Sequence, residues 1–107
     1  MVLKHIKSVE EYEEMKKEDK LMVIDFWAPW CGPCKMLGPI FEEVSKDYEE
    51  KIDFVKIDVD EVPDVATQFS VMSIPALFIV KGDEILDQSM GAMSKDQLKE
   101  FVDAHLE

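Results

Sequence analysis

The segment Leu21–Trp27 constrains the fold more than any other part of the sequence. All of its residues are apolar or aromatic except Asp25. The segment is too short for a typical helix and lacks the alternation of a strand with one face in water, so it predicts a strand buried on both faces. A strand of this kind must have other elements packed against both of its faces. We therefore expect a central strand between two layers of helices.

The remaining segments alternate between helical and extended character. Capping patterns, prolines and apolar spacing predict helices over residues 9–18, 34–48 and 63–69 and a last one after Ser94, with Pro39 kinking the second. The inner stripe of the last helix is Leu98, Phe101, Val102 and His105. Short apolar runs predict strands over residues 2–6, 21–27, 52–59, 76–80 and 85–88, the last two joined by a turn at Gly82. This order predicts an α/β fold in a single domain, residues 1–107, with a central mixed sheet of about five strands covered by about four helices.

The charge balance excludes one class of partner. The chain carries 24 acidic residues against 12 basic ones, all of them lysine, for a formal net charge of −12. A phosphate backbone would be repelled, so no nucleic-acid partner is expected, whereas basic proteins are mildly favoured. No membrane partner is expected because the apolar runs are too short to cross a bilayer, and residues 1–20 lack the apolar core of a secretion signal. A cytoplasmic location is the expectation that follows, and a monomer is the default expectation.

Cys31 and Cys34 are the only cysteines. A bridge between residues so close in sequence constrains the unfolded chain very little, which argues for a reactive disulfide rather than a structural one. The pair lies where a strand is expected to turn into a helix, and a helix N-terminus favours the thiolate. Cys31 could then attack a partner's disulfide, and Cys34, one helical turn later, could resolve the mixed disulfide. Gly32 permits a tight turn and Pro33 fixes the first helical turn.

Two interpretations of the cysteine pair that involve no disulfide exchange remain open at this point. The thiols could be idle, or they could be half of a zinc site. Zinc would need two further ligands, and the only histidines, His5 and His105, lie near opposite ends of the chain. No metal site is therefore expected.

The stretch from Phe26 to Lys35, FWAPWCGPCK, resembles the active-site segment of thioredoxins. A bare CxxC spacing is a weak signal, but the resemblance covers nearly the whole chain. It includes the chain length, the order of elements, Asp25, Pro39, Lys56, Ile74-Pro75, the Gly82 turn and Gly91. The chain is thus identified as a member of the thioredoxin family. This implies the thioredoxin fold, no bound cofactor, and a redox-active disulfide between Cys31 and Cys34.

The resemblance also implies roles for two charged residues. A carboxylate in a strand buried on both faces is costly unless it is paired or protonated. By resemblance, Asp25 is the buried acid that relays a proton when Cys34 attacks, and Lys56 is its charge partner. The residues alone leave alternatives open, because Asp25 could point to solvent at the strand end and Lys56 could extend out of a partly buried position.

A substrate-binding surface is expected near Pro75. By resemblance the Ile74–Pro75 bond is cis and lies against the cysteines, whereas the sequence alone equally permits a trans proline. The flat apolar rim for protein substrates would consist of Trp30, Met72, Ile74, Met90 and Gly91. Trp27 is expected to support the active-site loop from the core.

Some features of this surface leave the choice of partner open. Neutral packing is the alternative role for Met72 and Met90. Ala76 follows Pro75 where threonine is frequent in the family, and Met72-Ser73 and Met90 are further departures. None of these residues affects the thiol chemistry.

The resemblance implies a protein-disulfide reductase, an oxidoreductase of electron transport and cell redox homeostasis. Disulfide-containing proteins would be its substrates, and a thioredoxin reductase would re-reduce it. A thiol oxidase or isomerase on the same fold is less expected, because Pro33 stands where oxidising relatives often carry a histidine. A binding or scaffold subunit without turnover is the non-enzymatic alternative, and Cys31→Ser would distinguish it from a reductase.

Overall fold

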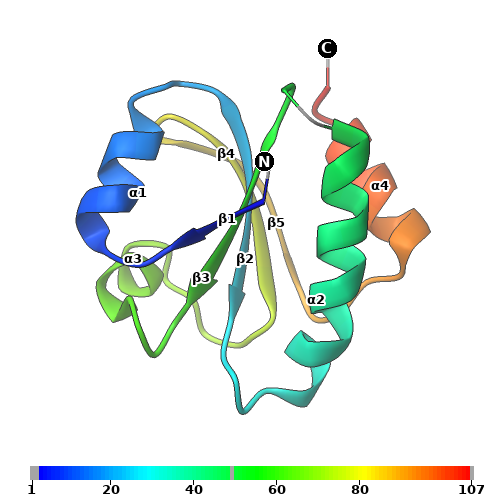
Figure 1. Ribbon diagram of the computed structural model, residues 1–107, viewed down its shortest axis with the longest axis horizontal. Helices are drawn as coiled ribbons and strands as arrows, with labels where there is room; N and C mark the ends of the chain where they lie inside the picture. The colour runs from blue at the N-terminus through cyan, green and yellow to red at the C-terminus, as the bar shows by residue number, and fades with distance from the viewer. Residues whose placement is uncertain (1–2, 49, 107) are drawn as a thin grey trace.

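The computed structural model describes residues 3–48 and 50–106, and these residues form one five-stranded sheet with helices on both faces (Figure 1). The strands are β1 (Leu3–Ile6), β2 (Leu21–Trp27), β3 (Asp53–Asp58), β4 (Ala76–Lys81) and β5 (Glu84–Met90). The helices are α1 (Val9–Lys16), α2 (Gly32–Ser45), α3 (Pro63–Gln68) and α4 (Lys95–Asp103), with a 3₁₀ turn over Lys46–Tyr48. The α/β fold class predicted from the sequence, with a central sheet of five strands and four covering helices, is confirmed.

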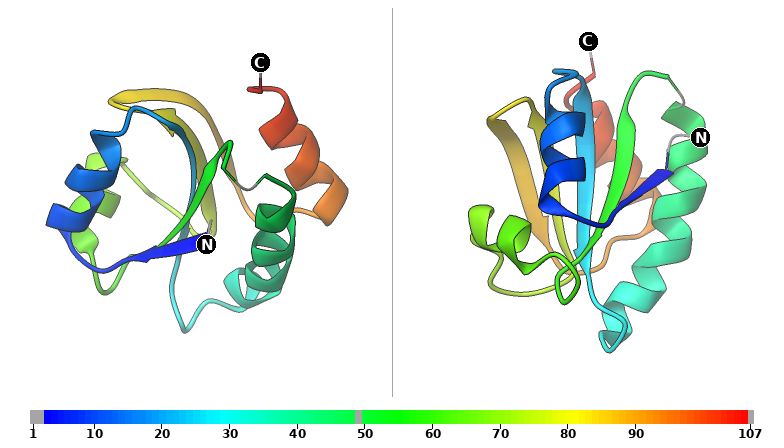
Figure 2. Two further views of the ribbon diagram at one scale, coloured as in Figure 1. Left: turned by 45° about the horizontal axis from the view of Figure 1, so that its top comes forward. Right: turned by 60° about the vertical axis from the view of Figure 1, so that its left-hand side comes forward.

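The sheet has the order β1-β3-β2-β4-β5, which makes β2 the central strand. β3 runs parallel to both β1 and β2, whereas β4 is antiparallel to β2 and β5. Helices α1 and α3 cover one face and α2 and α4 the other (Figure 2). The prediction of a strand buried on both faces is therefore correct.

Side chains of β2 alternate between the two helical layers. Met22, Ile24 and Phe26 pack toward α1 and α3, whereas Val23 packs toward α2 and α4. Asp25 shares the second face because side chains two positions apart on a strand point the same way. The one acid of the central strand thus faces the helix that begins at the cysteines.

Several element boundaries differ from those predicted. Helix α2 begins at Gly32 rather than Cys34, because extended Cys31 serves as its N-cap, and it ends at Ser45, after which the chain tightens into the 3₁₀ turn. Helix α1 ends at Lys16 rather than residue 18, and α3 at Gln68 rather than residue 69. Strand β5 is longer than predicted because it pairs along the whole of β4. The predicted edge strand β1 is confirmed from Leu3 onward, and Val2 lies outside the described residues.

The last helix also ends earlier than its apolar stripe suggested. Ser94 and Gln97 form the predicted capping box, but α4 stops at Asp103. His105 therefore lies beyond the helix, where its Nε2 is 2.9 Å from the Asp87 carboxylate of β5. No helix among the described residues is long and apolar enough to span a bilayer.

Candidate active site

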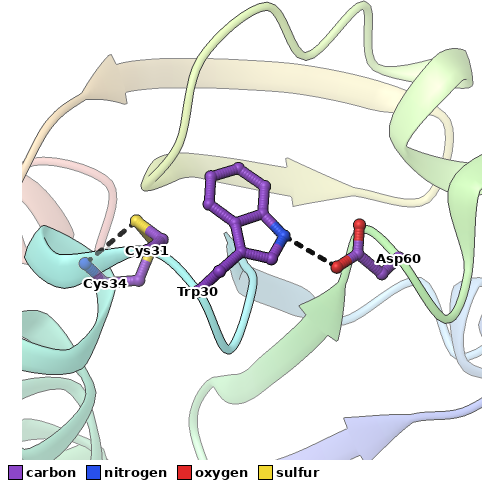
Figure 3. The surroundings of a disulfide bond; sticks show 4 residues. All are labelled: Trp30, Cys31, Cys34 and Asp60. Atoms are coloured by element: carbon purple, nitrogen blue, oxygen red, sulfur yellow. Dashed lines mark hydrogen bonds between the residues drawn. A yellow bond between two sulfur atoms is a disulfide. The ribbon is translucent and has the colours of Figure 1, made fainter.

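A disulfide joins Cys31, the N-cap of α2, to Cys34 in the first turn of the helix (Figure 3). The two Cα atoms are 5.3 Å apart and both residues are buried. The backbone N–H of Cys34 donates a hydrogen bond to the Cys31 Sγ at 3.2 Å. After reduction, that N–H and the positive end of the helix dipole would both stabilise a thiolate on Cys31.

The turn at the disulfide follows from the two residues between the cysteines. Gly32 and Pro33 occupy the first helical positions, where a missing N–H costs nothing and proline's fixed φ suits the helix. The Cys31 N–H donates to the Ala28 carbonyl at 3.1 Å, which closes the loop that leads from β2. Sequence and backbone thus agree that the helix starts at the cysteine pair.

Apolar residues from three parts of the chain support the disulfide. Ala28 is fully buried with the cysteines, and Trp27, Val59 and Ile74 pack against them. Trp27 lies where core support of the loop was expected. Ala28 and Val59 were not singled out from the sequence, because small apolar residues are common and the sequence does not show which of them pack against the cysteines.

Pro75 connects the end of β5 to this site. The Ile74–Pro75 peptide bond is cis, as the family resemblance implied. The Gly91 N–H donates to the Pro75 carbonyl at 2.8 Å, and Met90 pairs with Ala76 across the two strands. Gly91 has a φ of 91°, a backbone conformation that favours glycine.

An apolar cavity of about 340 Å³ lies beside the disulfide. Its lining residues are Trp30, Val59, Ala66, Val71, Met72, Ser73 and Ile74. Met72 is 89% exposed, which rules out neutral core packing for its side chain. Met90 is half-exposed and, with Gly91, does not line this cavity. The residues predicted to form one rim therefore fall into two groups. Trp30, Met72 and Ile74 line this groove, whereas Met90 and Gly91 form a separate segment at the end of β5.

Asp60 is a residue of the site that sequence reasoning missed. The indole Nε1 of Trp30 donates to the Asp60 carboxylate at 2.8 Å, and Figure 3 shows the ring lying between the disulfide and Asp60. The Asp60 N–H in turn donates to the Asp58 carboxylate at 2.9 Å. The acidic stretch after β3 is visible in the sequence, but its contact with Trp30 depends on the tertiary fold. Trp30 is 69% exposed, so this bond holds a large apolar side chain open to solvent.

Asp25 is completely buried, and neither carboxylate oxygen has a hydrogen-bond partner among the described residues. The alternative of a solvent-facing acid is therefore wrong. Burial raises the pKa of Asp25 from 3.8 to about 7, and the positive charge of Lys56 partly opposes this rise. An acid with such a pKa can hold or release a proton near neutral pH.

Lys56 is the register partner of Asp25 on the neighbouring strand. Its side chain is partly buried, and its Nζ lies 4.5 Å from the centre of the Trp27 ring. It forms no ion pair within the described part of the chain. Lys56 acts on Asp25 through its charge, without a direct contact short enough to be a salt bridge.

A second cavity, also of about 340 Å³, reaches the disulfide from the side of α2. Its lining residues are Leu3, His5, Trp27, Cys34, Lys35, Gly38, Pro39, Glu42 and Lys56. Cys34 and Lys56 therefore share one cavity, and the polar side chains His5, Lys35 and Glu42 also line it. In the described residues no three histidine, cysteine or acidic side chains gather as metal ligands would.

Comparisons with known proteins find relatives that match most of the chain. The family model described as Thioredoxin matches residues 3–104. The thioredoxin of Chlorobaculum thiosulfatiphilum is 44% identical over 93 residues, 87% of this chain and 86% of that one. The thioredoxin of Staphylococcus aureus is 46% identical over 93 residues, 87% of this chain and 89% of that one. The structure of Malassezia sympodialis thioredoxin has a TM-score of 0.89 at 35% identity, with 98% of this chain and 94% of that chain covered.

Proposed function

This chain belongs to the thioredoxin family and is a thiol-disulfide oxidoreductase that reduces protein disulfides through Cys31 and Cys34; on that basis we propose which residue performs each step. The Cys31 thiolate attacks one sulfur of the target disulfide, forms a mixed disulfide and releases the target's first thiolate. The Cys34 thiolate then attacks the Cys31 Sγ and releases the second. Two electrons pass to the target, and the Cys31–Cys34 disulfide is formed.

The observation that carries this assignment is the position of the Cys31 Sγ. It lies at the N-cap of α2 and accepts the Cys34 N–H, so the helix stabilises negative charge on this sulfur. Cys34 lies deeper in the first turn and lines the cavity of Lys56 and Trp27. The sulfur at the helix end therefore attacks, and the inner sulfur resolves the mixed disulfide.

Asp25 accepts the proton of the Cys34 thiol when that thiol attacks. Its support is a buried carboxyl without a hydrogen-bond partner, whose pKa of about 7 suits proton transfer near neutral pH. The positive charge of Lys56 stabilises the ionised form of Asp25, which must be present before the proton is transferred. The polar-lined cavity at Cys34 gives the proton a way to exchange with water.

The groove formed by Trp30, Met72 and Ile74 binds an extended segment of the substrate protein. The Ile74 backbone pairs with that segment, and Met90 and Gly91 contact it from the end of β5. Methionine side chains adapt their shape, which suits substrates of varied sequence. A thioredoxin reductase in the same cytoplasmic compartment returns the pair to the dithiol, and the protein works as a monomer.

Trapping of the mixed disulfide tests the assignment. The Cys34→Ser variant, incubated with insulin, should retain an insulin chain as a covalent adduct on a non-reducing gel. The matched Cys31→Ser variant should retain none, and both should lose turnover in the insulin turbidity assay. An adduct on Cys31→Ser and none on Cys34→Ser would reverse the two roles.

A further inference from the structure

Gly38 occupies an unexpected position in the middle of α2. Glycine is among the weakest helix formers, and its usual justification is a backbone that other residues cannot adopt. Gly38 has ordinary helical backbone angles, unlike Gly82 and Gly91 with their positive φ values. The backbone therefore does not require glycine here, and the reason must lie in the space that a side chain would take.

That space is occupied by a charged group. A Cβ atom added at Gly38 would lie 3.3 Å from the Lys56 Nζ, and no other heavy atom outside the adjoining backbone would lie within 4 Å. A Cβ at Gly32, in the first turn of the same helix, would meet nothing within 4 Å. The close approach of the ammonium is thus specific to Gly38, which lies one helical turn beyond Cys34 and shares its face.

Lys56 lies in a row of titratable residues. His5 on β1 and Asp25 on β2 are both its register partners, so the three side chains share the face covered by α2. From α2 itself, Lys35 and Glu42 line the same cavity. The ammonium lies between the Trp27 ring and the open side of Gly38.

We propose that Gly38 is a positioning residue: its missing side chain lets the Lys56 ammonium lie against α2, in line with Asp25, and so sets the strength with which that charge acts on the carboxyl. The proposal rests on the role of Asp25 given above. A methyl group at this position would displace the ammonium. The cavity lined by His5 and Glu42 leaves room for this displacement, whereas Asp25 is fully buried.

The Gly38→Ala variant tests this. Titration of the Asp25 carboxyl carbon by NMR in the oxidised protein should show a midpoint higher than in the wild type. The expected rise is on the order of 0.1 pH unit, the size produced by moving one unit charge a few tenths of an ångström farther away at an effective dielectric constant near 20. Alanine favours a helix, so thermal unfolding of the variant should show no loss of stability.

Two controls separate positioning from a general change in α2. In the Lys56→Met background, adding Gly38→Ala should leave the midpoint unchanged, because the charge on which it acts is absent. Met36→Ala changes an exposed residue of α2 that lines neither cavity, and it should also leave the midpoint unchanged. An unchanged or lower midpoint in Gly38→Ala, or an equal rise in the Lys56→Met background, would overturn the proposal.

The NMR titration measures the protonation of the Asp25 carboxyl directly and does not depend on catalytic turnover. A wild-type rate of mixed-disulfide release in Asp25→Ala would disprove the proton-transfer role of Asp25. It would leave the titration result for Gly38 standing. The two failures can therefore be told apart.

Discussion

The two faces of the sheet each bury one aspartate, and the two carboxyls differ in whether they have a partner. On the face of α1 and α3, Asp53 is 4% exposed and lies 3.3 Å from the ammonium of Lys20. On the face of α2 and α4, Asp25 is fully buried and has no hydrogen-bond partner among the described residues. One face satisfies its charge by contact, and the other keeps a carboxyl whose pKa of about 7 allows it to change protonation near neutral pH. The first arrangement serves the fold. The second lowers stability, and it is the one to which we assign the proton transfer proposed above.

The packing around the two carboxyls follows the same division. Toward α1 and α3, Phe26, Phe69 and Phe78 pack with ring centres 5.0 to 5.6 Å apart, and Tyr12 joins them through Phe69. Toward α2, the core near Asp25 gives way to the cavity that holds Lys56 and reaches Cys34. The α2 face also has an aromatic group, in which the ring centre of Phe54 lies 5.0 Å from that of Phe41 and 5.8 Å from that of Tyr48. The two faces therefore differ in the cavity at Lys56 and not in whether they contain aromatic packing.

Phe26→Ala gives the largest expected effect, because Phe26 is the neighbour of Asp25 that points into the aromatic cluster. Loss of this fully buried ring should lower the free energy of unfolding by about 3–5 kcal/mol, measured by urea denaturation. The milder Phe26→Leu should lose less. In the folded variant the titration midpoint of Asp25 should stay near that of the wild type. A large shift of that midpoint would show that the two faces are not independent.

Asp25→Ala should act in the opposite direction. The folded pKa of about 7 lies above the ordinary value of 3.8, so the unfolded chain releases this proton first and stability falls as the pH rises from about 4 to about 7. At about 1.4 kcal/mol per pH unit, ionising the buried acid costs about 4 kcal/mol above pH 7. Part of the gain is lost with the packing of the carboxyl.

The expected net gain for Asp25→Ala is about 2 kcal/mol near pH 8 and close to zero near pH 5.5. Urea denaturation of the oxidised protein at both pH values measures it. Release of the mixed disulfide should also become slower, as followed by the decay of the insulin adduct. A variant that is less stable than the wild type near pH 8, with an unchanged release rate, would contradict both parts.

Asp53→Ala is the matched substitution on the other face, and it should destabilise. It removes a carboxylate that has a partner, and it leaves Lys20, which is about one-third exposed and can turn to water. We expect a loss of about 1–2 kcal/mol near pH 8, with no effect on insulin reduction. If Asp53→Ala stabilised the protein as Asp25→Ala is expected to, burial alone would explain both residues and the contrast between the faces would fail.

The contrast between these faces shows which features the sequence could predict. The short apolar run Leu21–Trp27 predicted β2 as a central strand, and the Ser94–Gln97 capping box located the start of α4 correctly. Both depend on neighbours within a few residues. The start of α2 was predicted two residues too late, at Cys34 instead of Gly32, because Cys31 caps the helix with sulfur rather than with the oxygen of a usual N-cap residue.

The contacts that define the site depend on long-range packing. Cys31, Cys34, Asp25 and Pro75 were singled out because a cysteine pair, a buried acid and a proline are conspicuous in sequence. The contact of Trp30 with Asp60 and the space that Gly38 leaves for Lys56 were not, because each joins residues that are far apart in the sequence. A glycine in a helix is visible in sequence, but what fills the space beside it is not.

Lys56→Met and Lys20→Met give the smallest expected effects and compare the two cations directly. Lys56 acts on Asp25 through its charge at a distance, so its loss should raise the Asp25 titration midpoint by about 0.5 to 1 pH unit in the NMR experiment, more than Gly38→Ala does. Lys20 touches Asp53 on the other face, so Lys20→Met should leave the Asp25 midpoint in place and instead lower stability by about 1 kcal/mol. Equal shifts from both lysines would mean that Asp25 senses the total charge of the protein. A shift from Lys56 alone would show that the local row on the α2 face controls the acid.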